Sequence, residues 1–187
     1  METLEERIAR VLKDRIELVP YDPAWPDLFE AEKAHLLDCL PSNLIVRIEH
    51  YGSTSIPDMV AKPVVDMLVE VPDLEAVREQ VPPILEAQGY DFFWRPVGKD
   101  GEPPFYAWLI KRGSQGERTH HIHMVEASFR HWEGLVFRDY LRSHPDAALE
   151  YATLKQELSK KFADDRIAYT YGKTEFIQQV LNAAGEG

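Results

Sequence analysis

The chain has 187 residues, of which 44% are hydrophobic and 28% charged, proportions typical of a soluble globular protein with a substantial core. Its 21 lysines and arginines against 32 aspartates and glutamates give a formal charge of −11. Nonspecific binding to nucleic acid or to an anionic membrane needs clustered basic side chains, so this balance argues against both functions. A local basic pocket for a small phosphorylated ligand remains compatible with it.

Three features of the sequence lead us to expect a cytoplasmic protein. No apolar run approaches the length of a membrane span, and the charged opening segment METLEERIARVLKDR is unlike a secretory signal. The single cysteine, Cys39, cannot form an intramolecular disulfide, which fits a reducing compartment.

The first forty residues predict a helix, a short strand and a second helix. Residues 5–14 have a weak amphipathic pattern, and residues 16–21 favour a strand. Residues 22–40 predict a clearer helix, in which Asp22 can cap the first turn and Pro23 suits its start. Its apolar residues recur at helical spacing and predict one buried stripe of Trp25, Leu28, Phe29, Leu36, Leu37 and Leu40.

The middle of the chain is rich in predicted strands. They cover residues 43–51, 62–71, 90–97, 105–112 and 119–127, with a helix over 73–88 that we expect to be interrupted near Pro82 and Pro83. This order favours an antiparallel or mixed sheet over repeated βαβ units.

From residue 128 onward the hydrophobic period becomes helical. We expect one helix with Trp132, Leu135 and Leu141, a second with an apolar stripe from Tyr151 to Phe162, and a third starting at residues 164–165. We therefore expect a single domain over residues 1–187, with a sheet-containing core over about 16–127 and C-terminal helices over about 128–184.

Strand alternation divides the predicted strands into faces. His50 falls on an apolar face, which favours a hydrogen-bonded core histidine, whereas Glu49 falls on the polar face. Asp66 points away from the apolar face of its strand, and His121 and His123 point away from Ile122 and Met124. Each of these side chains could be a harmless polar group on a surface strand. If the strands are neighbours, however, one sheet face presents Glu49, Asp66, His121 and His123 together.

Six segments in order make the chain resemble the GrpB family, whose fold is that of the nucleotidyltransferase superfamily. They are YDPAWP, IEHYGSTSIP, AKPVVDMLV, HHIHMVE, FRDYLRSHPD and YGKTEFI. GrpB domains are also similar to the C-terminal extension of some dephospho-CoA kinases. The resemblance implies an α+β fold: a nucleotidyltransferase-like mixed sheet with helices on one face and a helical C-terminal part.

The resemblance also implies a phosphate-binding turn after the first core strand. Gly52 and Ser53 match the Gly-Ser pair of the superfamily, in which glycine allows close approach of the backbone and the serine hydroxyl can bind phosphate oxygens. Ser55 could add a hydroxyl contact or simply satisfy the turn. Asp58 stands where the family usually has glycine, and it adds negative charge near the turn.

On the next strand the superfamily carries two acids that hold divalent metal at a triphosphate. Asp66 matches the first acid, but Leu68 occupies the second position and offers no oxygen to Mg²⁺ or Mn²⁺. Glu49, or His121 and His123, could compensate. One carboxylate with two histidines is a plausible ligand set for Zn²⁺, iron or Mn²⁺.

Three basic residues are candidates for binding an anion. Lys62 precedes the Asp66 strand and matches the AKP segment of the family, although a solvated loop lysine would read the same way. Lys173 falls on the apolar stripe of the last predicted helix, where a lysine needs a counter-charge or must reach a cleft. Arg138 lies three residues from both Leu135 and Leu141, so it could bind an anion or form a structural ion pair.

The predicted function is binding of a nucleotide or another phosphorylated small molecule, held by Gly52, Ser53 and Ser55 and by the candidate basic residues. Asp66 and Glu49 are the candidate catalytic residues for a metal-dependent nucleotidyl transfer to a small acceptor. Two alternatives belong to other classes: a noncatalytic ligand-binding or regulatory module, and a transition-metal enzyme that uses Asp66, His121 and His123.

Overall fold

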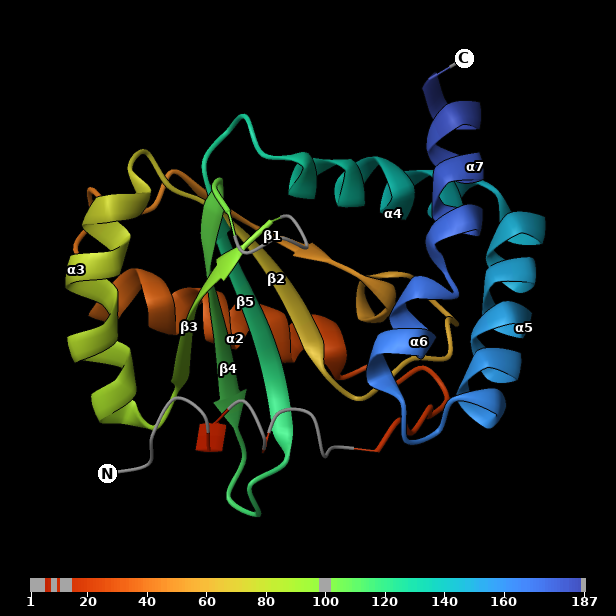
Figure 1. Cartoon of the computed structure of the whole chain (residues 1–187), viewed down its shortest axis with the longest axis horizontal. Coiled ribbons are helices and arrows are strands. Elements are labelled where there is room, and N and C mark those ends of the chain that lie inside the picture. The colour runs from red at the N-terminus through yellow and green to blue at the C-terminus, as the bar shows by residue number, and fades with distance from the viewer. Residues whose placement is uncertain (1–5, 8–9, 11–14, 98–101, 186–187) are drawn as a thin grey trace.

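The computed structural model describes residues 6–7, 10, 15–97 and 102–185. Five strands form one sheet in the order β1-β2-β5-β4-β3 (Figure 1). Their bounds are β1 Arg47–Tyr51, β2 Val65–Glu70, β3 Asp91–Pro96, β4 Phe105–Arg112 and β5 Arg118–Val125. β2 and β5 run parallel, whereas the other neighbouring pairs are antiparallel. The predicted mixed sheet is confirmed.

Two helices, α2 (Trp25–Cys39) and α3 (Leu74–Leu85), cover one face of this sheet. Figure 1 shows α2 running behind the strands and α3 beside β3. The largest core cluster lies between these helices and the sheet, and it includes Phe29, Leu36, Met67, Val69, Val77, Val81, Leu109 and Ile122. The alternation of β2 and β5 thus directs Met67 and Ile122 into this core and leaves Asp66, His121 and His123 on the other face.

The buried stripe of α2 differs from the prediction at two leucines. Leu28 is 45% exposed and Leu37 52% exposed, whereas Trp25, Phe29 and Leu36 are buried. The stripe instead passes through Glu32, whose carboxylate accepts hydrogen bonds from the Tyr90 hydroxyl at 2.5 Å and from Lys111. A charged residue can lie on the buried face because both partners satisfy it.

The start of α2 also differs from the prediction. The helix begins at Trp25, with Pro26 rather than Pro23 in its first turn, and Ala24 makes no side-chain cap. Asp22 instead accepts a hydrogen bond from the Ala24 amide at 2.9 Å, just before the helix.

Two further predictions in the first half are wrong. Residues 16–21 form only an isolated bridge between Val19 and Ala61, not a strand. α3 is not interrupted at Pro82 and Pro83, which lie inside it. The carbonyls that lose a donor there belong to exposed residues 78 and 79, so water can replace the missing hydrogen bonds. The predicted helix over residues 5–14 lies mostly outside the described residues.

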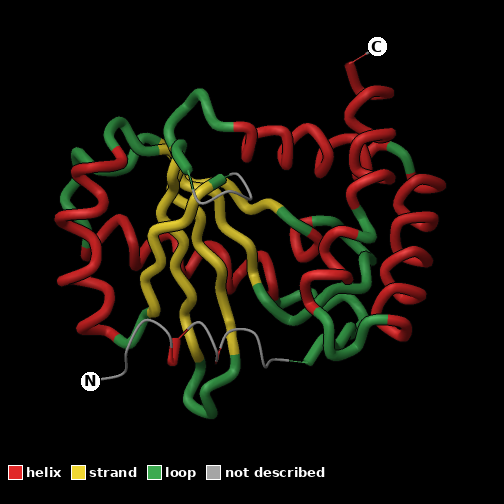
Figure 2. Tube along the Cα trace, viewed as in Figure 1, coloured by secondary structure: helices red, strands yellow, loops and turns green. Residues whose placement is uncertain are grey.

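The C-terminal part consists of α4 (Glu133–Ser143), α5 (Pro145–Lys161), α6 (Arg166–Tyr171) and α7 (Thr174–Gly185). Figures 1 and 2 show these helices grouped beyond the β1–β2 side of the sheet. The predicted third helix is broken at Gly172 and Lys173 into α6 and α7, and Trp132 lies in a short 3-10 turn before α4. None of the described helices is both long and apolar enough to cross a membrane.

The neighbouring residues Leu36 and Leu37 provide a direct test of the α2 packing. Leu36 is completely buried, so Leu36→Ala should lower the free energy of unfolding by about 2–5 kcal/mol. The matched change Leu37→Ala removes the same atoms from an exposed position and should change it by less than about 0.5 kcal/mol. Urea denaturation measures both. Equal losses would contradict the observed orientation of α2.

Candidate functional site

A tight turn follows β1 and packs directly against Asp66 of β2. Gly52 adopts φ +70°, a conformation that favours glycine, and residues Ser53–Ser55 form a single 3-10 turn. A Cβ atom at Gly52 would lie 2.5 Å from Asp66 Oδ2 and 2.9 Å from Asp66 Cβ. Glycine is therefore required for two independent reasons, the backbone conformation and the close approach of Asp66.

The hydroxyl groups of the turn have different partners. Ser55 Oγ donates to the Gly52 carbonyl at 2.6 Å, and Thr54 Oγ1 lies 3.0 Å from His50 Nε2. Ser53 Oγ accepts a hydrogen bond from Lys155 Nζ at 3.0 Å. Ser55, predicted to contact phosphate, thus closes the turn, whereas Gly52 and Ser53 line a cavity beside it.

His50 has the structural role that the strand pattern predicts. It is buried and stacks on Phe29, with ring centroids 4.8 Å apart. Burial, with a smaller opposing effect from Asp66, lowers the pKa of His50 to about 4, so the ring is neutral at pH 7.

Asp66, His121 and His123 converge as the strand pattern predicts. β2 and β5 are parallel neighbours in which Asp66 lies opposite His121 and Leu68 lies opposite His123. His121 Nδ1 is 3.1 Å from Asp66 Oδ1. One ligand atom from each of Asp66, His121 and His123 can be chosen so that all three lie within 4.8 Å of one another. The arrangement could hold a metal ion.

The pKa values in this group show which members are charged. Burial raises the pKa of Asp66, but the hydrogen bond and charge of His121, together with Lys62, outweigh it and leave the pKa below its usual value. Burial lowers the pKa of His121 despite the contact with Asp66, and it lowers the pKa of His123 further. Asp66 is therefore ionised and both imidazoles are neutral at pH 7.

Glu49 and Arg138 lie apart from this group and pair with each other. Arg138 Nη1 is 3.3 Å from Glu49 Oε2 and donates to the His50 carbonyl at 2.8 Å, while its Nε donates to Asp139 at 2.7 Å. Neither Glu49 nor Arg138 is among the residues that line the cavity. Glu49 lies opposite Leu68, not Asp66, in the β1–β2 register, and its carboxylate contacts Arg138 of α4. Of the two roles considered for Arg138, anion binding and a structural ion pair, these contacts match the ion pair.

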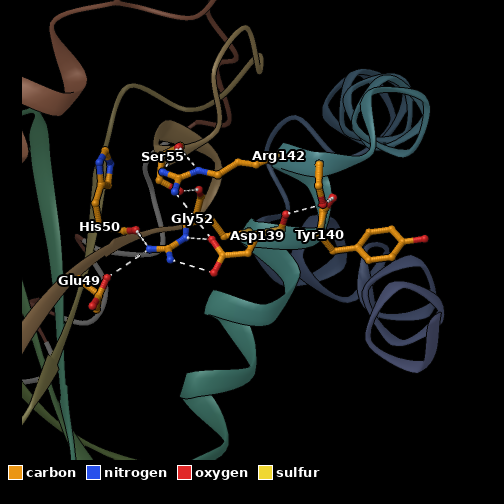
Figure 3. Close-up of polar contacts among 9 residues, drawn as sticks. Glu49, His50, Gly52, Ser55, Asp139, Tyr140 and Arg142 are labelled. Atoms are coloured by element: carbon orange, nitrogen blue, oxygen red, sulfur yellow. Dashed lines mark hydrogen bonds and ion pairs between the residues drawn. The ribbon is translucent and has the colours of Figure 1, made fainter. Parts of the chain in front are cut away.

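A second arginine of α4 holds the other end of the turn. Arg142 Nη2 donates to the Ser55 carbonyl at 2.6 Å, and its Nε donates to the same oxygen at 3.1 Å. Figure 3 shows Arg142 reaching Ser55, with Asp139 close by, where its Oδ1 lies 3.7 Å from Arg142 Nη1. Arg138 and Arg142 thus bind carbonyls on both sides of Gly52 and fix the turn against α4.

The cavity has a volume of about 450 Å³ and lies between the sheet and the C-terminal helices. Three lysines from separate segments line it: Lys62 before β2, Lys155 on α5 and Lys173 between α6 and α7. Lys155 is only 2% exposed and also donates to the Val60 carbonyl. The other lining residues used below are Asp66, His121, Arg130, His131 and Glu133.

Each of the three lysines has a lowered pKa. Burial is the main cause, and neighbouring cations add to it: the pKa is about 7 for Lys62 and Lys155 and about 8 for Lys173. Lys62 and Lys173 lie over the Tyr169 ring, with Nζ 5.9 Å and 4.7 Å from its centroid. The cavity therefore gathers three lysines whose charge responds to pH near neutrality, in a chain whose overall charge is strongly negative.

Lys155 and His131 are among the lining residues that the sequence prediction missed. Lys155 lies four residues after Tyr151 and three before Leu158, both buried, so helical spacing could have placed it inward. His131 lies in the 3-10 turn before α4, and its buried Nδ1 has no hydrogen-bond partner among the described residues. No periodic pattern covers that turn, so the sequence carried no comparable signal for His131.

Comparison with known proteins gives the family. The family model described as GrpB protein matches residues 15–183. The chain belongs to the GrpB family. The UPF0157 protein YqkA of Bacillus subtilis is 41% identical over 170 residues, which cover 89% of this chain but 46% of YqkA. A dephospho-CoA kinase of Mycolicibacterium paratuberculosis is 27% identical over 94% of this chain and 47% of the kinase. The chain thus spans about half the length of either protein.

Solved structures confirm the fold that the resemblance implied. Conserved protein GrpB from Enterococcus faecalis superimposes with a TM-score of 0.76 at 34% identity, over 91% of this chain and 98% of that one. A cytoplasmic RNA terminal U-transferase superimposes with a TM-score of 0.50 at 12% identity, over 89% of this chain and 50% of that one. At this identity the second comparison shows only a shared nucleotidyltransferase-like fold.

Gly52 and Gly116 both have positive φ, and comparing them distinguishes the cost of backbone strain from the cost of steric crowding. Gly52→Ala should lower the free energy of unfolding more than Gly116→Ala, because both residues have positive φ but a Cβ at Gly116 meets nothing within 4 Å. The conformation alone should cost about 1–2 kcal/mol, and the contact with Asp66 about 1–3 kcal/mol more. Chemical denaturation of the two variants measures the difference. Equal losses would mean that Asp66 moves aside freely.

The lowered lysine pKa values predict a pH dependence of stability. Between pH 7 and 9 the folded protein loses protons that the unfolded lysines, with pKa near 10.4, still bind. The free energy of unfolding should therefore rise with pH over this range. Below pH 7 it carries the full cost of burying the protonated lysines. The rise should be smaller in Lys155→Met than in the wild type, measured by urea denaturation without ligand.

The exposed residue Lys160, also on α5, supplies the control for this pH series. Lys160→Met should follow the wild-type pH profile, and the comparison cancels contributions from other groups such as Cys39. Identical profiles for the two lysine variants would contradict the lowered pKa of Lys155.

Proposed function

We propose that this chain binds a phosphorylated small molecule in the lysine-lined cavity, with nucleotides as the first class to test. The observation that carries the proposal is the gathering of Lys62, Lys155 and Lys173 around one cavity beside the Gly52–Ser53 turn. These lysines come from distant parts of the chain, so the fold, and not local sequence, brings them together.

The electrostatics of the cavity support an anionic ligand. Its described lining contains Lys62, Lys155, Lys173 and Arg130 against the carboxylates of Asp66 and Glu133. Burying ammonium groups beside one another is costly unless anions compensate them. A phosphorylated ligand would supply that compensation and raise the lysine pKa values toward their ordinary range. A cavity of this size also suits a small molecule better than a nucleic acid chain.

A divalent cation beside the ligand belongs to the same proposal. Asp66 and His121 line the cavity and, with His123, form a group with metal-ligand spacing. A cation held there would face the phosphate oxygens of a ligand that the lysines bind. Zn²⁺, iron, Mn²⁺ and Mg²⁺ are the ions to compare.

The proposal is for ligand binding and does not include nucleotidyl transfer. Leu68 stands where the superfamily pattern has its second acid, and it is completely buried. Transfer by two metal ions would need ligands that hold both ions at the reacting phosphate. Release of pyrophosphate from a nucleoside triphosphate in the presence of Mg²⁺ or Mn²⁺ would extend the proposal to catalysis.

Replacing the most buried of the three lysines tests the proposed ligand class. Inorganic pyrophosphate and nucleoside mono-, di- and triphosphates should raise the melting temperature of the wild type, whereas nucleosides without phosphate should not. Lys155→Met should weaken binding by about tenfold or more, because it removes the ammonium group and leaves an unbranched side chain that is only one atom shorter. Isothermal titration calorimetry in the presence of a chelator gives the affinities without a metal contribution.

Lys160→Met is the matched control, since it removes an exposed lysine from the same helix and leaves the overall charge equal to that of Lys155→Met. Its affinity should equal that of the wild type. If no phosphorylated compound binds, or if both variants lose affinity equally, the cavity is not the binding site.

A further inference from the structure

The position of Leu68 raises the question of how a metal ion could be held at Asp66. Leu68 points to the same sheet face as Asp66 and is completely buried in a cluster with Trp108, Ile110 and Val125. A single carboxylate is a poor site for Mg²⁺, which prefers oxygen ligands in octahedral geometry. β2 on its own therefore does not supply a metal site.

The neighbouring strand supplies the missing ligand. In the parallel register of β2 and β5, His121 lies opposite Asp66 and His123 lies opposite Leu68. His123 thus stands beside the position at which the second carboxylate is absent. Its ring is held by Tyr106, stacked at 5.7 Å, and by Tyr51, edge-on at 5.7 Å.

The hydrogen bonding of His123 points to a ligand. Its Nδ1 is buried and has no hydrogen-bond partner among the described residues. Leaving a buried polar atom without a partner costs about 1–3 kcal/mol, so such an atom in a folded protein calls for an explanation. A metal ion shared with Asp66 and His121 would satisfy it.

We propose that Asp66, His121 and His123 form a transition-metal centre that binds Zn²⁺ more tightly than Fe²⁺, Mn²⁺ or Mg²⁺, and in which a histidine of β5 replaces the second acid of β2. Imidazole nitrogens favour Zn²⁺, Fe²⁺ and Mn²⁺ over Mg²⁺, and Zn²⁺ binds more tightly than the other two. Asp66 and His121 line the cavity whereas His123 does not, so the ion lies at the cavity wall. Its remaining coordination positions are open to water or to a ligand oxygen.

This inference concerns the same cavity as the proposed function, but the metal centre requires no phosphorylated ligand. The two can therefore fail separately. Binding of pyrophosphate or nucleotides in a chelator tests the lysines, and binding of metal in the absence of phosphorylated compounds tests the three ligands.

Equilibrium dialysis of the chelator-treated protein against Zn²⁺, Mn²⁺ and Mg²⁺, one ion at a time, tests the centre. We expect one equivalent of Zn²⁺, weaker binding of Mn²⁺ and no saturable binding of Mg²⁺. Loss of an outer-shell partner typically weakens metal binding by about 10–100-fold. His123→Gln should weaken Zn²⁺ binding by more than that, because His123 contacts the ion directly. Co²⁺ binding, followed by visible absorption, should show ligand-field bands that His123→Gln changes.

His144→Gln is the control, because it also removes an imidazole, but from an exposed position outside both the cavity lining and the three-ligand group. It should bind Zn²⁺ with wild-type affinity. His121→Gln should reproduce the loss seen in His123→Gln, and it serves if that variant does not fold. Wild-type affinity in both ligand variants, saturable Mg²⁺ binding equal to that of Zn²⁺, or no metal binding at all would overturn the centre.

Discussion

The Asp66 carboxylate is the charge on which the arrangement of the cavity depends. It accepts the contact from His121, and it leaves no room for a side chain at Gly52. It also partly offsets the repulsion among the three lysines, whose lowered pKa values would fall further without it. Burial raises the pKa of Asp66, and the hydrogen bond and charge of His121, together with Lys62, lower it below its usual value. The turn, the histidines and the lysines are thus coupled through one group.

That group is positioned by the parallel pairing of β2 and β5, two strands far apart in the sequence. A shift of one residue in this register would turn Asp66 toward the core and bring Met67 to the cavity face. The register is secured by the opposite face, where Met67, Val69 and Ile122 are completely buried under α2 and α3. Apolar packing on one face therefore fixes the geometry of ionisable groups on the other.

Strand alternation predicted that Asp66, His121 and His123 would share a face if their strands were neighbours, and the pairing of β2 with β5 meets that condition. It could not predict that Glu49 lies two register positions away from Asp66 along the sheet and is covered by Arg138, since that depends on where α4 packs. Lys155 is a different case. Helical spacing from the buried Tyr151 and Leu158 was enough to direct it inward, whereas its contact with Ser53 depends on the docking of α5.

The C-terminal helices complete the cavity as well as adding stability. The sheet part supplies Asp66 and Lys62, whereas Lys155 comes from α5 and Lys173 from the break between α6 and α7. The sequence predicted one continuous helix, but the chain breaks between α6 and α7, and Lys173 lines the cavity from that break. An anion bound among these lysines would contact both parts of the chain and oppose their separation. Removal of the repulsion among the ammonium groups would then be the physical link between ligand binding and the packing of the C-terminal helices.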